Sequence, residues 1–345
     1  MGDGGWGTTL AIVLHRKGYQ VSLWGAFPDY VAYLNRKRIN SKFLPEVRIP
    51  QGIEISHNLK GVLAVSELII LAIPSQYLRG VLRKVKKYGC PQKAVYLSVT
   101  KGIEMGSLKR MSEVIREELG SVKLAVLSGP TIAHEVANGV PTTAVIASGD
   151  EKLRKDLQQV FMTESFRIYT NDDLIGVELG GSLKNIVAIA CGISDGLGFG
   201  TNTKAALLSR GLAEISRLGQ AMGAKVGTFS GISGLGDLVT TCISPYSRNR
   251  YVGEQIGKGK TLKQVKAYMQ MPACLTGRQA CRLPHRQAGH AGVAEGVPTA
   301  NCAYALSLKY KVEMPITREV YRVLYKNKSP LRAVKDLMTR EKKEE

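Results

Sequence analysis

Two patterns of hydrophobic and polar positions follow one another along this chain. In the first, short runs rich in β-branched residues alternate with segments of helical period, which predicts a mostly parallel sheet with helices on both faces. We expect strands at residues 20–24, 68–73, 94–99, 123–127 and 142–147. We expect helices between them at residues 28–35, 75–85, 108–119 and 131–137.

The second pattern begins near residue 172, where the strand signal fades and amphipathic helices take over. The clearest predicted helix covers residues 202–222, whose apolar positions recur at helical spacing. Pro298, Pro315 and Pro330 each suit the first turn of a further helix. We therefore predict an α/β domain over residues 1–171 and an all-α domain over residues 172–345.

The chain opens with a glycine-rich run that matches the GxGxxG pattern through Gly2, Gly4 and Gly7. Such a turn lets a backbone approach a pyrophosphate at the start of a helix, although a flexible chain start explains the run equally well when it is taken alone. The turn normally follows a central strand, and only Met1 precedes it here. We therefore expect that the first strand is missing, and that the natural product begins upstream or this chain is unstable and binds cofactor poorly.

One lysine and one asparagine, Lys184 and Asn185, lie inside a largely apolar segment, residues 176–192. Gly180 and Gly181 remove side chains just before the lysine, so backbone or ligand can come close. A lysine in such a setting has a depressible pKa and suits the transfer of a proton to a carbonyl oxygen. The alternative, which the helix taken alone favours, is a lysine that extends its ammonium to water.

Several predicted turns offer groups that bind anions. Two strands end in turns that contain Lys101 and Gly129, and residues 231–237 form a glycine-rich turn that ends in Asp237. Ser247 suits the N-cap of a helix that begins with Arg248, so free amides and a guanidinium would coincide there in a phosphate site. Ordinary β-to-α turns and a capped helix with exposed arginines are the alternatives.

Composition limits the class of protein. The 48 Lys and Arg outnumber the 28 Asp and Glu, and this net charge of +20 is shared by both halves, with no basic tail. It favours an anionic small molecule over a specific nucleic-acid partner, with a merely solubilising surface as the alternative. The apolar run at 68–73 is too short to cross a membrane, and the six cysteines form no CxxC pair, so we predict a cytoplasmic protein without a transmembrane segment.

Residues 272–292 fit neither pattern. They contain two Cys, three Arg, two His and two Pro with no helical or strand period, which predicts an inserted loop without catalytic groups. The spacing of Cys274, Cys281, His285 and His290 fits no familiar zinc site, so we expect no metal.

Ordered motifs along nearly the whole chain resemble those of the bacterial NAD(P)-dependent glycerol-3-phosphate dehydrogenase family. They are GDGGWGTTLA, NRKRINSKFLP, VTKGIE, LSGPT, GVELGGSLKNIVAIACGISDGLGFGTNTKAALLSRGLAE, GLGDLVTTC, SRNR, VAEGVPT and EMPIT. The resemblance implies a Rossmann-like dinucleotide-binding domain followed by a helical substrate domain. It also implies reversible reduction of dihydroxyacetone phosphate to sn-glycerol 3-phosphate by NADPH or NADH, feeding glycerophospholipid synthesis. A homodimer is possible.

The resemblance further implies roles for individual residues. Lys184 is the implied catalytic acid and base, and Arg248 and Asn249 are implied to bind the substrate phosphate. The implied substrate-binding residues are Lys101, Gly129, Thr131, Lys184, Asn185, Asp237, Thr241, Ser247, Arg248 and Asn249. The implied cofactor-binding residues are Gly2, Gly4, Gly5, Trp6, Gly7, Lys101, Ala133, Arg248, Val293 and Glu295.

The tip of the second predicted strand bears on the choice of cofactor. Residues 23–27 read Leu-Trp-Gly-Ala-Phe and include no acid that would bind the 2′-hydroxyl of NAD, and Asp29 lies further on in the next helical turn. We therefore expect NADPH to serve at least as well as NADH. Two other functions stay open: a related β-hydroxyacid or 6-phosphogluconate dehydrogenase-like reductase, and a catalytically impaired homologue that acts by binding alone.

Overall fold

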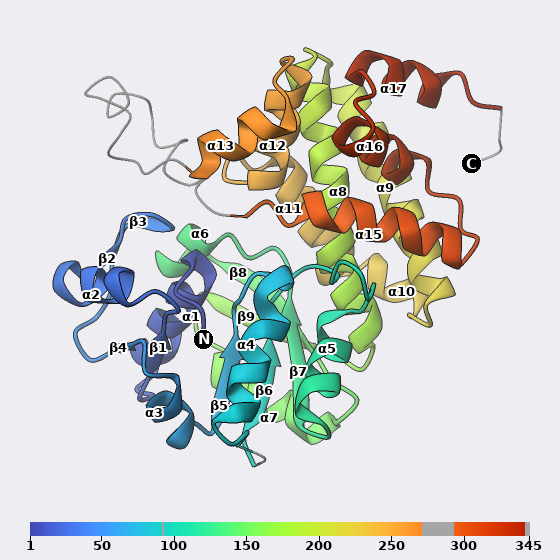
Figure 1. The fold of residues 1–345 in the computed structure, drawn as a ribbon. Helices are drawn as coiled ribbons and strands as arrows, with labels where there is room; N and C mark the ends of the chain where they lie inside the picture. Colours follow the sequence, from blue (N-terminus) through green and yellow to red (C-terminus); the bar gives the residue numbers. More distant parts are fainter. Residues whose placement is uncertain (92, 271–292, 342–345) are drawn as a thin grey trace.

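The computed structural model describes residues 1–91, 93–270 and 293–341, in which a sheet-containing part lies beside a helical part (Figure 1). The main sheet has five strands in the order β5-β6-β7-β8-β9, and all neighbours are parallel except β7 and β8. These strands are β5 Leu68–Leu71, β6 Val95–Ser98, β7 Lys123–Ser128, β8 Thr142–Ala147 and β9 Phe166–Asn171. The predicted mostly parallel sheet is thus confirmed.

Both faces of this sheet are covered because successive residues of a strand point in opposite directions. In β6, Tyr96 packs into the core beneath α4 Ser75–Lys87 and α5 Met111–Leu119. The next residue, Leu97, packs into the core beneath α1 Gly5–Arg16 and α7 Glu151–Phe161. The helices on opposite faces therefore hold the strand ends in place.

The position of the expected first strand is held by two residues. Among the described elements α1 comes first, and the short pair β1 Ser22–Trp24 and β4 Glu54–Ser56 is separate from the main sheet. Met1 lies beside β5 at the edge of the main sheet. Its amino group donates to the Ile70 carbonyl at 2.7 Å, and its carbonyl accepts from the Ala72 amide at 2.9 Å. The Gly2 amide donates to the Trp24 carbonyl at 2.9 Å, so the glycine turn is joined to the ends of both β1 and β5.

The structure adds elements that the sequence pattern did not predict. In the sheet-containing part they are β2 Ile39–Asn40, β3 Leu44–Arg48, β4, α3 Leu59–Ala64, α7 and β9. The elements β2, β3, β4 and α3 are short, so their periodic signals are weak, whereas the alternation of buried and exposed residues in β9 is a strand signal that we did not use. Two predicted helices begin later than expected, at Met111 and, for α6 Ala133–Ala137, at Ala133.

The helical part is arranged around α8 Leu174–Gly196, which stands at its centre (Figure 1). The proline predictions are confirmed: Pro315 and Pro330 are the first residues of their helices, and Pro298 lies in the first turn of α15. The other helices are α2 Pro28–Lys37, α9 Thr201–Ala221, α10 Val226–Phe229, α11 Asp237–Ile243, α12 Arg248–Gly257, α13 Leu262–Gln270, α15 Gly296–Lys309, α16 Pro315–Tyr325 and α17 Pro330–Met338. Residues 272–292, with the cysteines and histidines considered for zinc, lie outside the described residues.

Helix α8 is long and apolar enough to cross a membrane by length and composition, with a mean hydropathy of 1.5. However, 94% of that apolar window is buried inside the protein. Such burial is typical of the core helix of a folded domain, and it is the only helix of this kind in the described part of the chain.

Helix α8 crosses α12 with their backbones in contact. A Cβ atom at Gly192 of α8 would overlap the carbonyl oxygen of Arg250, and one at Gly253 of α12 would overlap that of Ile189. Only glycine allows this approach from both sides. The contact fixes α12 against the second half of α8, which follows Lys184 and Asn185.

We predict that Gly192→Ala lowers the free energy of unfolding by about 1–3 kcal/mol, because the added methyl group forces the two backbones apart. The matched control is Gly80→Ala, at an exposed position inside α4 where a Cβ atom meets nothing within 4 Å. The control should gain about 0.5–1 kcal/mol from its higher helix propensity. Urea unfolding of both variants measures the difference, and equal effects would contradict a tight crossing.

Candidate active site

The candidate site lies where the carboxyl ends of the parallel strands meet the helical part. Lys101 follows β6 and Gly129 follows β7, as the sequence predicted. The Lys101 ammonium donates to the Gly129 carbonyl at 2.9 Å and to Asp237 Oδ2 at 2.7 Å. The sheet and the helical part therefore share an ion pair at this edge.

Lys184 is buried rather than extended to water, with only 5% of its surface exposed. Its ammonium donates to Asp237 Oδ1 and, at 2.6 Å, to Thr241 Oγ1. The alternative of a lysine that reaches solvent is therefore wrong. Gly181, one helical turn earlier, allows the close approach of Ser128, whose hydroxyl would overlap a Cβ atom placed there.

Asp237 is 1% exposed and holds two ammonium groups, one on each carboxylate oxygen. It is preceded by a π-helical turn, Ile232–Gly236, which runs directly into α11. We had expected a glycine-rich turn at 231–237, so this is a correction. At Gly234 the chain passes against the Phe229 backbone, which leaves no room for a side chain and explains the glycine.

The pKa of Lys184 is lowered to about 7. Burial of the ammonium is the main cause, the positive charge of Lys101 adds to it, and the Asp237 carboxylate opposes it. At neutral pH both protonation states of Lys184 are therefore populated. A group with such a pKa can both donate and accept a proton under the same conditions.

A second group of residues extends the site along α12. The Asn249 amide donates to Asn185 Oδ1 at 2.9 Å, and its Oδ1 accepts from the Gly296 amide at 2.9 Å. Ser247 caps α12 as predicted, since its hydroxyl oxygen accepts from the Arg250 amide at 3.2 Å. Arg248 begins the helix with an exposed side chain, so a guanidinium and a helix N-terminus coincide.

Glu295 connects the helical part to the sheet-containing part. Its carboxylate accepts from the Ser75 amide at 3.0 Å and from the Ser75 hydroxyl, at the start of α4. Burial raises the pKa of Glu295, while the bonds from Ser75 and the nearby charge of Arg248 oppose that shift. Sequence reasoning missed Ser75, because a serine at the start of a helix is indistinguishable from an ordinary cap. Val293, at the edge of the described residues, is exposed.

The glycine turn fits a dinucleotide. Gly4 precedes α1 without a side-chain cap, the first turn has no acid, and a Cβ atom at Gly4 would meet nothing within 4 Å. The amides of Gly5, Trp6 and Gly7 are therefore available to a pyrophosphate. Ala133 is adjacent, since its carbonyl accepts from Thr9 Oγ1 at 3.0 Å. The Trp6 ring packs edge-on against Phe166.

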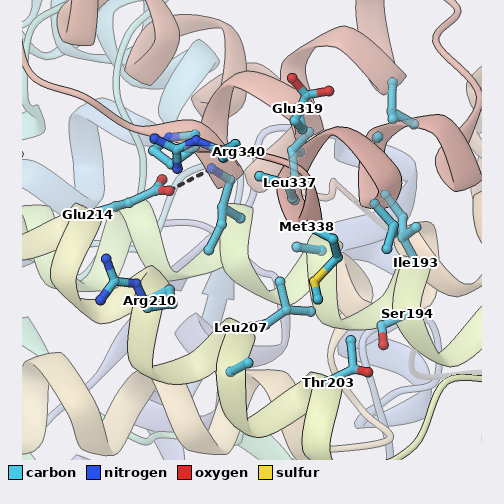
Figure 2. Close-up of a pocket in the computed structure, with 18 of the residues that line it drawn as sticks. Ile193, Ser194, Thr203, Leu207, Arg210, Glu214, Glu319, Leu337, Met338 and Arg340 are labelled. Carbon is cyan, nitrogen blue, oxygen red and sulfur yellow. Dashed lines mark hydrogen bonds between the residues drawn. The ribbon is translucent and has the colours of Figure 1, made fainter. Parts of the chain in front are cut away.

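A cavity of about 660 Å³ lies away from these groups. Side chains of α8, α9, α16 and α17 line it, among them Ser194, Leu207 and Met338 (Figure 2). It contains none of the candidate site residues. Within the described residues, no group of three or more His, Cys, Asp or Glu side chains is arranged to hold a metal ion.

A dinucleotide turn on a parallel sheet, joined to a helical domain that carries a buried lysine, is typical of a nicotinamide-dependent oxidoreductase. The family described as NAD-dependent glycerol-3-phosphate dehydrogenase matches the chain through both of its domains, the N-terminus over residues 1–154 and the C-terminus over residues 173–335. The chain belongs to this family.

Individual relatives agree. A glycerol-3-phosphate dehydrogenase [NAD(P)+] of Prosthecochloris aestuarii is 47% identical over all of this chain and 98% of its own length. One of Thermoanaerobacter sp. is 46% identical over all of this chain and 97% of its own length. The crystal structure of glycerol-3-phosphate dehydrogenase from Coxiella burnetii is 39% identical, with a TM-score of 0.88 over 98% of this chain and 97% of that one.

The lowered pKa of Lys184 makes a prediction about stability. The pKa of Lys184 is 10.5 in the unfolded chain and about 7 in the folded protein, so between these values unfolding takes up a proton. The free energy of unfolding therefore increases with pH from about 7 to 10.5, and this contribution is lost as pH falls toward 7. Lys184→Met removes this dependence, so its unfolding free energy relative to wild type should fall as pH rises from 7 to 9. Exposed Lys155→Met is the control and should show no such trend in urea unfolding.

Proposed function

We propose that this protein catalyses the reversible reduction of dihydroxyacetone phosphate to sn-glycerol 3-phosphate with NADPH or NADH. The observation that carries the proposal is the buried Lys184, whose pKa of about 7 suits a group that alternately donates and accepts a proton. Membership of the glycerol-3-phosphate dehydrogenase family supports the choice of substrate.

A nicotinamide cofactor held by the glycine turn would supply the hydride for reduction and accept it in the reverse direction. Lys184 donates its proton to the carbonyl oxygen as negative charge develops there, so the oxygen becomes the hydroxyl of the product. In the reverse direction the neutral amine takes that proton back. Asp237 holds the ammonium in place, and Lys101 on its other oxygen adds positive charge beside the same oxygen of the substrate.

The remaining site residues bind and orient the reactants in this proposal. Arg248 and the free amides at the start of α12 bind the phosphate, and Asn249 positions Asn185. Gly129, Thr131, Thr241 and Ser247 line the substrate site. On the cofactor side, the amides that follow Gly4 bind the pyrophosphate, with Gly2, Ala133, Val293 and Glu295 alongside.

An assay of NADH and NADPH oxidation with and without dihydroxyacetone phosphate tests the proposal. We expect oxidation that depends on this substrate and is absent with β-hydroxyacid or 6-phosphogluconate substrates. Activity with those alone would support the related reductase instead. Cofactor binding without turnover of any substrate would show a catalytically impaired homologue. Cytoplasmic location and a homodimer stay predictions, the latter measurable by sedimentation.

We predict opposite pH profiles for the two directions of the reaction. Because reduction needs protonated Lys184 and oxidation needs the neutral amine, kcat for reduction should fall and kcat for oxidation should rise as pH increases through about 7. Lys184→Met should lower kcat by about 10²–10⁴-fold and abolish the titration near pH 7, with a smaller effect on cofactor binding. An unchanged kcat would remove Lys184 from this role.

We predict that Arg248→Ala weakens the recognition of phosphate. Loss of a charged hydrogen bond should lower kcat/KM for dihydroxyacetone phosphate by a factor that corresponds to about 1.5–3 kcal/mol of binding free energy. The value of kcat/KM for unphosphorylated dihydroxyacetone should change little. Arg210→Ala, at an exposed position of α9, is the matched control and should leave both values unchanged. An equal loss with both substrates would show that Arg248 acts on something other than the phosphate.

A further inference from the structure

The tip of β1 has no acidic residue of its own, but the fold brings one to it from the glycine turn. Gly25 follows the last residue of β1, and a Cβ atom placed there would lie 2.5 Å from Oδ2 of Asp3. The hydrogen bond from the Gly2 amide to the Trp24 carbonyl, 2.9 Å long, holds the turn against this strand end. The Asp3 carboxylate therefore lies over the tip of β1.

This carboxylate has an unused oxygen. Oδ2 of Asp3 is buried and accepts no hydrogen bond from the described residues. The side-chain amide of Asn40 donates at 2.8 Å to the main-chain carbonyl of Asp3 and not to its carboxylate. Burial raises the pKa of Asp3, while the hydrogen bond from its own main-chain amide and the positive charges of the amino terminus and Lys42 oppose that shift. A buried acceptor without a donor is costly unless a ligand supplies one.

We propose that Asp3 accepts a hydrogen bond from the 2′-hydroxyl of the adenosine ribose and thereby selects NADH over NADPH. In dinucleotide-binding folds an acid at the end of the second strand binds this hydroxyl, and here Asp3 reaches the same place through space. The 2′-phosphate of NADPH would meet a carboxylate and be repelled. The inference rests on the proposed function, and it opposes our expectation from the strand tip alone.

Two basic residues in the segment after α2, Arg38 and Lys42, have contacts of their own in the structure. Arg38 donates through Nη1 to the Ile53 carbonyl at 2.7 Å, although its Nε has no partner among the described residues. Lys42 lies over the aromatic rings of Tyr30 and Phe43, at 6.0 and 5.1 Å from their centroids. Since Lys42 is close enough to Asp3 for their charges to interact, it is the cation most able to favour a 2′-phosphate instead. Asp3 thus favours NADH, whereas Lys42 favours NADPH.

Direct binding of both cofactors tests the inference without reliance on turnover. Dissociation constants for NADH and NADPH are measured by fluorescence titration on the full chain, together with kcat/KM for each. We expect wild type to bind NADH at least tenfold more tightly. Asp3→Asn, which keeps the shape but removes the charge, should shrink that ratio by about 10-fold or more, as for a charged hydrogen bond. Asp29→Asn, at an exposed position of α2, is the matched control and should leave the ratio unchanged.

Two results would overturn the inference: wild type that binds NADPH as tightly as NADH, or an Asp3→Asn variant that folds with an unchanged ratio. If Asp3→Asn does not fold, Asp3→Ser gives the same comparison, and the wild-type ratio alone remains decisive. If Lys42→Ala weakens the binding of NADPH tenfold and Asp3→Asn changes neither dissociation constant, then Lys42 and not Asp3 selects the cofactor. Failure of the proposed function looks different, because both cofactors would then bind while dihydroxyacetone phosphate is not reduced with either.

Discussion

The shared carboxylate of Asp237 is the interaction on which the rest of the site depends. Lys101 comes from the end of a strand and Lys184 from the core helix α8, and each ammonium contacts a different oxygen of this buried side chain. Two ammonium groups brought together without it would repel one another in a region that water does not screen. With it, both stay in place, while burial of the Lys184 ammonium outweighs the opposing effect of the carboxylate and lowers the pKa of Lys184 to about 7.

The surrounding architecture holds these groups at fixed separations. The glycines of α8 and α12 bring the two backbones into contact, and Asn249 of α12 donates a hydrogen bond to Asn185, which follows Lys184 in α8. Glu295 binds Ser75 across the boundary between the helical and the sheet-containing parts, so the glycine turn and Lys184 are held by one connected set of contacts. Rigid placement of this kind is how a protein aligns a hydride donor with a proton donor.

The amino-acid sequence by itself determined the broad architecture and the chemistry of the site. Periods of two and of 3.6 residues located four strands of the main sheet and the principal helices, because burial on one face leaves a regular trace. A lysine in an apolar segment and a capped helix beginning with arginine were visible as local anomalies. The short strands β2, β3 and β4 were not, because a few residues carry too little periodicity.

Only the tertiary structure decided which distant groups meet. That Lys184 is buried and shares Asp237 with Lys101 depends on residues far apart in the chain, and the helix alone favoured a lysine in water. The same holds for Ser75 beneath Glu295 and for Asp3 over the tip of β1. Local sequence patterns report which face of an element is buried, whereas the pKa and partners of a side chain are set by neighbours that folding brings together.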